Sequence, residues 1–323
     1  MQKYLRPAAF VITLVATVLT TVMRILLTPE MQDTQTGTFH VSYIVIGVML
    51  ISMILIAFFS LIRNSDTLHI GEIPLHNRAP VKVAGVLLGL SLMVSSLFDM
   101  FMWAVYGQTP PPNETVIGRL DSISLTFTLI FGILAGMYFL WLAVKLNENK
   151  MQSSPARSLA ALSPVVWIWV RLVRYQVSYA SAIQVERSFY DFVMLIFTML
   201  FLFSFAQYIA KINRRPPRML IFYSLCTALN SLSGPVVVVA LFLMGESEAF
   251  NSSRLAGLSD FAVGMFALCT AISLIFVNEK IDDNAQDSVE MQPDDNVNND
   301  SSPTVDEILK DLGKQEQDEN NQL

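Results

Sequence analysis

The chain has 323 residues, of which 53% are hydrophobic and only 15% are charged. Soluble domains contain about a quarter charged residues, so this composition argues against a soluble globular protein. The formal net charge of −6 is spread unevenly. Residues 281–323 hold 13 acidic residues and two lysines, a net of −11, whereas residues 1–280 carry a net of +5. We therefore predict a membrane domain at 1–280 and an acidic tail at 281–323.

Eight apolar runs are long enough to cross the hydrocarbon core of a bilayer as helices. Their hydrophobicity is continuous rather than alternating, which favours helices over the strands of a membrane barrel. The predicted fold class is all-α: a polytopic integral membrane bundle of eight transmembrane helices, followed by a disordered cytoplasmic C-terminal tail. The runs cover residues 7–27, 41–62, 82–106, 118–143, 160–183, 189–210, 219–244 and 259–278.

Lysine and arginine are concentrated in one set of short loops, which predicts the orientation of the chain. The N-terminal segment and the loops after the second, fourth and sixth runs together hold 12 basic residues. The opposite loops carry only Arg119, Arg187 and Arg254, with Arg24 at a helix end. Because basic loops stay on the cytoplasmic side, we expect a multi-pass protein of the cell membrane with both termini in the cytoplasm.

The third and fourth runs each contain two glycines spaced four residues apart. These are Gly85 and Gly89 in "GVLLG", and Gly132 and Gly136 in "GILAG". Small residues at this spacing let two membrane helices approach closely. We predict a close crossing of the third and fourth helices.

The fifth run contains "VVWIWVRLVRYQ" (165–176), in which Arg171 and Arg174 share one helix face. Charges at bilayer depth are costly and usually face a partner or a water-filled cavity. If the fifth helix extends to residue 183, Arg171 lies roughly 18 Å below the outer surface, near the midplane. The acidic residues that share the outer half of the bundle are Asp99, Asp121, Asp191 and Asp260.

We predict an outward-facing polar cavity with the two arginines at its floor and Asp99 as their nearest partner. The planar guanidinium binds carboxylates and phosphates in a bidentate manner, so an arginine left over from pairing would bind an anionic ligand. Asn230, in the polar segment "ALNSLSGPVVVV" (228–239) around Pro235, is a further candidate ligand residue. The alternative is that all these charges only hold helices together. The predicted ligand-binding residues are Arg171, Arg174, Asp99, Asp121, Asp191 and Asn230.

The acidic tail contains one segment, "TVDEILKDLGK" (304–314), with the pattern of a short amphipathic helix near residues 304–313. Thr304 and Glu307 form a capping-box pair, and Gly313 is placed to end the helix. Such a face binds grooves of partner proteins, although the tail could also be an inert solubilising segment. The predicted partner-binding residues are Val305, Ile308, Leu309 and Leu312.

Two functions remain open after these observations. The first is a transporter or sensor of a small polar or anionic molecule, and it depends on the intramembrane charges. The second is a membrane scaffold or accessory protein that recruits a cytoplasmic partner through its acidic tail. Motifs of metalloproteases, serine hydrolases and phosphate-binding loops do not occur in the sequence. We therefore expect no enzyme, no cofactor, no metal and no nucleic-acid partner.

Overall fold

A computed structural model describes the chain over residues 5–33, 38–61, 79–106, 117–145, 159–179, 185–210, 218–244 and 256–290. All secondary-structure elements in these ranges are helices, which confirms the all-α prediction. The predicted partner-binding segment at 304–313 lies outside the described residues. The helices are α1 (Leu5–Asp33), α2 (Thr38–Leu61), α3 (Ala79–Tyr106), α4 (Ile117–Lys145), α6 (Ser163–Tyr179), α7 (Val185–Ile209), α8 (Arg218–Leu243) and α10 (Ala256–Glu290).

Seven of the described helices are long and apolar enough to cross a membrane. Their apolar segments are Pro7–Leu26, Ile44–Leu61, Ala79–Phe101, Ile123–Lys145, Tyr190–Ile209, Arg218–Ala240 and Gly257–Ile275. The remaining described helix, α6, has 17 residues. This corresponds to a length of about 25 Å at 1.5 Å per residue. The described helix Ser163–Tyr179 lies within the predicted run 160–183, and residues 180–184 are outside the described part of the chain.

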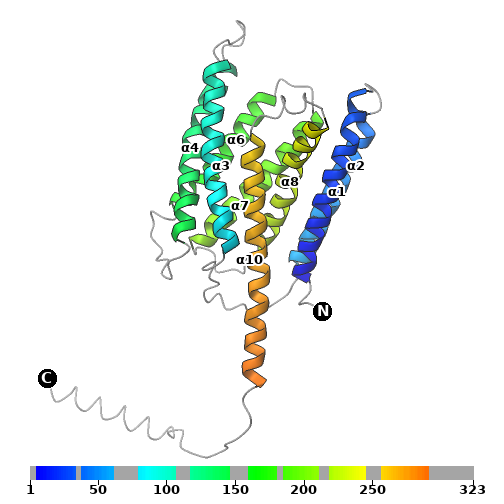
Figure 1. The fold of residues 1–323 in the computed structure, drawn as a ribbon, viewed down its shortest axis with the longest axis vertical. Helices are drawn as coiled ribbons and strands as arrows, with labels where there is room; N and C mark the ends of the chain where they lie inside the picture. The colour runs from blue at the N-terminus through cyan, green and yellow to red at the C-terminus, as the bar shows by residue number, and fades with distance from the viewer. Residues whose placement is uncertain are drawn as a thin grey trace, which may run out of the picture. The chain divides into compact units, whose positions relative to one another are not determined.

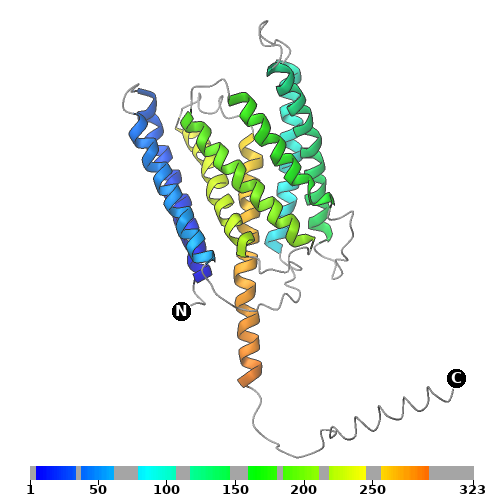
Figure 2. The same ribbon diagram turned by 180° about the vertical axis from the view of Figure 1, so that it is seen from behind.

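The chain divides into two compact units, Met1–Lys280 and Ile281–Leu323. In the first unit, α3 packs against α4, α4 against α6, and α6 against α7. On the other side of α7 lies α8, which also contacts α1 and α2. Figures 1 and 2 show these neighbours from opposite sides, with the upper part of α10 in the middle of the bundle.

The predicted close crossing of α3 and α4 is confirmed at the glycines. A Cβ atom added to Gly89 would lie 2.8 Å from the carbonyl oxygen of Gly136. At the next turn, a Cβ atom on Gly132 would overlap the hydroxyl of Ser96. The two helices therefore touch backbone to backbone, which only glycine allows here.

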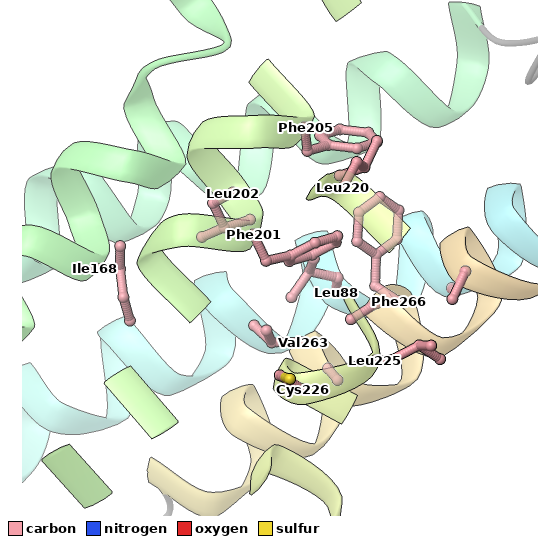
Figure 3. Close-up of a cluster of buried hydrophobic side chains, with 14 of the residues drawn as sticks. Leu88, Ile168, Phe201, Leu202, Phe205, Leu220, Leu225, Cys226, Val263 and Phe266 are labelled. Atoms are coloured by element: carbon pink, nitrogen blue, oxygen red, sulfur yellow. The ribbon is translucent and has the colours of Figure 1, made fainter. Parts of the chain in front are cut away.

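Phe266 on α10 joins the central helix to its neighbours (Figure 3). Its ring packs edge-on against Phe139 of α4 at 5.1 Å and against Phe205 of α7 at 5.2 Å between centroids. Phe201 of α7 lies 6.1 Å away. All four rings are almost completely buried. Edge-to-face contacts of this kind stabilise aromatic clusters beyond the area that they bury.

The polar residues of the described spans are mostly accommodated within their own helices. Hydroxyls of serine and threonine donate to the carbonyl three or four residues earlier, as Thr13 does to Ala9 at 2.8 Å. This arrangement satisfies a hydroxyl without a partner from another helix. In α8, Pro235 lies inside a helix that continues without a break from Arg218 to Leu243.

Candidate functional site

The charged site is built around a two-pronged ion pair between α6 and α10. Nη1 of Arg171 donates to Oδ1 of Asp260 at 2.6 Å, and Nη2 donates to Oδ2 at 3.1 Å. These two hydrogen bonds match the planar fork of the guanidinium to both carboxylate oxygens, the strongest form of this pairing. The side chains are 17% and 13% exposed, so most of the surface of both charged groups is buried.

The partner of Arg171 differs from the sequence-based prediction, which favoured Asp99. Asp260 is one of the acids that the sequence placed in the outer half of the bundle, at the start of the eighth run. Depth alone does not select a partner, because it says nothing of which helices are neighbours. The central position of α10 brings Asp260 within hydrogen-bonding distance of α6.

The described helices place the ion pair relative to the helix ends. Arg171 is eight residues from the end of α6 at Tyr179, or about 12 Å along the helix. Asp260 is four residues from the start of α10 at Ala256, or about 6 Å. The pair therefore lies about two turns from the described end of α6 and about one turn from the start of α10.

Trp167 supports the guanidinium from one turn earlier on α6. The carbon at the centre of the Arg171 guanidinium lies 5.0 Å from the ring centroid of Trp167, a cation–π contact. The indole itself is 3% exposed and packs on α4, where Gly132 leaves room for it. Close packing of α3, α4 and α6 thus fixes the surface on which Arg171 rests.

Two further acids act on Arg171 without being its direct partner. Asp99 on α3 and Asp191 on α7 both add attractive electrostatic interactions with its guanidinium. Both side chains are partly buried and have interactions of their own. Together with Arg174, the residues Arg171, Asp260, Asp99 and Asp191 form what we call the charged cluster.

The remaining predicted ligand residues lie in different surroundings. Arg174 is partly buried on α6 and has interactions of its own, so it is not a surplus charge left over from pairing. Asp121 lies in α4, and its side chain is outside the described part of the structure. Asn230 is buried in α8 and donates from Nδ2 to the carbonyl of Cys226 at 2.7 Å.

One contact of a charged residue has no counterpart in the sequence-based prediction. The guanidinium of Arg24 on α1 lies 4.7 Å from the ring centroid of Tyr190 on α7. Tyr190 precedes Asp191, so this contact brings α1 to the edge of the charged cluster. The sequence indicates only that Arg24 stands near a helix end, because a contact between α1 and α7 depends on tertiary packing.

The helices and this site define the class of the protein. Seven apolar helices of sufficient length identify a multi-pass membrane protein whose spans lie in a lipid bilayer. Comparisons with known protein families, with curated proteins and with solved structures gave no match. The charged cluster is therefore interpreted from its own chemistry.

Chemically, the cluster combines two guanidinium groups, of Arg171 and Arg174, with three carboxylates, of Asp99, Asp191 and Asp260. A guanidinium that already holds a carboxylate through two hydrogen bonds has the geometry to hold the carboxylate of another molecule. The neighbouring acids keep the cluster close to electrical neutrality, which lowers the cost of placing charges among apolar helices.

Proposed function

We propose that the protein transports or senses a small polar or anionic solute, which binds at the charged cluster. The observation that carries this proposal is the Arg171–Asp260 pair, which joins two apolar helices and yet stays partly exposed. Sealing an ion pair completely costs desolvation energy, and the remaining exposure of this pair lowers that cost and supports access for a solute.

The solute class follows from the guanidinium groups. Carboxylate and phosphate groups fit the planar fork of Arg171, and Arg174 lies one turn further along the same helix face. A solute with one anionic group and additional polar groups would bind the arginines and also the carboxylates Asp99 and Asp191. The cavity that admits it opens, in this proposal, to the outer side of the cell membrane, since the positive-inside rule places both termini in the cytoplasm.

The experiment measures ligand-induced thermal stabilisation of the full chain in lipid nanodiscs. The probes are acetate, succinate, glutamate and inorganic phosphate, tested at constant ionic strength. Any probe that binds the folded state raises the Tm in a saturable manner. We expect at least one probe to do so, and we expect Arg174→Gln to lose the response.

Arg174 is the test residue because Arg171 also holds α6 to α10, so its loss affects stability. Arg218→Gln is the matched control, since Arg218 is a partly buried arginine at the start of α8. The control should keep the response. If all probes leave the Tm unchanged, or if Arg174→Gln responds as the wild type does, the proposed solute site is wrong.

A further inference from the structure

Two buried hydroxyls of α8, like the phenol of Tyr138 in α4, have no hydrogen-bond partner among the described residues, in contrast to most serines and threonines of the spans. Thr13, Thr20, Thr128, Ser224 and Thr270 each donate to a carbonyl of their own helix at 2.8 Å. Thr227 and Ser231 are completely buried, but their hydroxyl oxygens have no hydrogen-bond partner among the described residues. Buried hydroxyls are seldom left unsatisfied, because burial removes them from water without compensation.

Both hydroxyls lie on the same side of α8. Thr227 and Ser231 are four residues apart, so their side chains stand one above the other on one helix face. This face is turned toward α10, where a Cβ atom on Gly264 would lie 3.1 Å from the Cβ atom of Ser231. The two unsatisfied oxygens therefore face the contact between α8 and α10.

Pro235 adds a third oxygen to this set. A residue in a helix normally donates its N–H to the carbonyl four residues earlier, and proline has no N–H to donate. The carbonyl of Ser231 consequently lacks its usual helical donor. α8 thus presents the hydroxyl and the carbonyl of Ser231, with the Thr227 hydroxyl one turn earlier on the same face.

The opposite helix provides small residues at this level. Gly264, Ala267 and Ala271 share a face of α10 at spacings of three and four residues, and both alanines are completely buried. Asp260 lies one turn from Gly264 on the same helix, and its carboxylate is paired with Arg171.

We propose that Thr227 and Ser231 bind a Na⁺ ion between α8 and α10. Hydroxyl and carbonyl oxygens are hard ligands, and a set of neutral oxygens suits a monovalent cation rather than Ca²⁺ or Mg²⁺, which favour carboxylates. Carbonyls released from helical pairing coordinate Na⁺ in membrane transporters of several folds. The site is separate from the charged cluster, so the proposal goes beyond the proposed solute site and stands independently of it.

The test compares the Tm of the full chain in lipid nanodiscs in NaCl, KCl and N-methyl-D-glucamine chloride at equal ionic strength. Binding to the folded state alone raises the Tm as the ion is added. We expect a saturable rise with Na⁺ and a much smaller rise with K⁺. The variants Thr227→Val and Ser231→Ala should each raise the half-saturating Na⁺ concentration by about tenfold, the effect of losing one charge–dipole contact.

These variants are expected to fold, because each removes a buried hydroxyl that has no partner to leave behind. Ser224→Ala is the matched control, since its hydroxyl is equally buried but already donates to Ile221. The control should keep the Na⁺ response. The proposal is overturned if the wild type has the same Tm in all three salts, or if Thr227→Val and Ser231→Ala retain the full Na⁺ response. Either result would mean that these hydroxyls do not bind Na⁺.

Discussion

Gly89 and Gly136 face each other across the contact between α3 and α4, and each occupies the space that the other's side chain would need. A Cβ atom on Gly89 would lie 2.8 Å from the Gly136 carbonyl oxygen, and a Cβ atom on Gly136 would lie 2.8 Å from the Gly89 carbonyl oxygen. Since the obstructing atoms belong to the backbone, rotation of a side chain does not relieve the overlap. The position of α3 and α4 relative to each other therefore depends on these two residues.

We predict that Gly89→Ala destabilises the protein by about 1–3 kcal/mol, the usual cost of forcing extra volume into a packed contact. The measurement is unfolding by SDS titration, monitored by circular dichroism. Gly85→Ala is the control, because a Cβ atom there would meet its nearest neighbours at 3.7 Å, an ordinary contact. Equal stability of the two variants would show that the backbones are not in contact.

The pair of Arg171 and Asp260 should behave as a unit in a double-mutant cycle. Arg171→Met or Asp260→Leu alone leaves one charge without its partner, which costs about 3–5 kcal/mol in buried pairs. Partial exposure of both side chains places the expected loss at the lower end of this range. The double variant removes both charges and should be less destabilised than the sum of the two single variants.

SDS titration again gives the free energies of unfolding for this cycle. Coupling of at least about 1 kcal/mol is expected for residues joined by two hydrogen bonds. Strictly additive losses would mean that Arg171 and Asp260 do not depend on each other, which would contradict the geometry of the pair.

The sequence was sufficient for features that depend on local pattern. Continuous apolar runs predicted the helices, and the spacing of Gly85, Gly89, Gly132 and Gly136 predicted where α3 and α4 meet. These patterns can be recognised in the sequence because each of them lies within a single helix. Arg171 was found in the same way, since it interrupts an apolar run, whereas Asp260 was noted in the outer half of the bundle but was not among the predicted ligand residues.

Partners of individual residues could not be read from the sequence. The sequence favoured Asp99 as the partner of Arg171 because depth was the available criterion, whereas the packing of α10 beside α6 brings Asp260 to the guanidinium. The sequence also does not show that the Thr227 and Ser231 hydroxyls lack hydrogen-bond partners. All three residues lie in the same helix, and the Ser224 hydroxyl donates to Ile221.

Phe266 should be among the most sensitive positions of the core. Its ring contacts phenylalanines of α4 and α7, and it is 0% exposed. We predict that Phe266→Ala costs about 3–5 kcal/mol in SDS titration, because the cavity would lie where three helices meet. Phe101→Ala is the control, since Phe101 is 61% exposed on α3 and should cost little. Similar losses at both positions would argue against a central aromatic core.

The orientation of α7, α8 and α10 in the membrane depends on whether α6 crosses the bilayer. Its 17 residues give a length of about 25 Å, which is less than the roughly 30 Å of the hydrocarbon core, so thinning or flanking residues must cover the difference. If α6 crosses, the segments before and after it lie on opposite sides of the membrane.

We predict that single cysteines at Ser153 and Ser181, in a background lacking Cys226 and Cys269, react with a membrane-impermeant maleimide from opposite sides. Labelling of both from one side would mean that α6 does not cross and that the two termini lie on different sides.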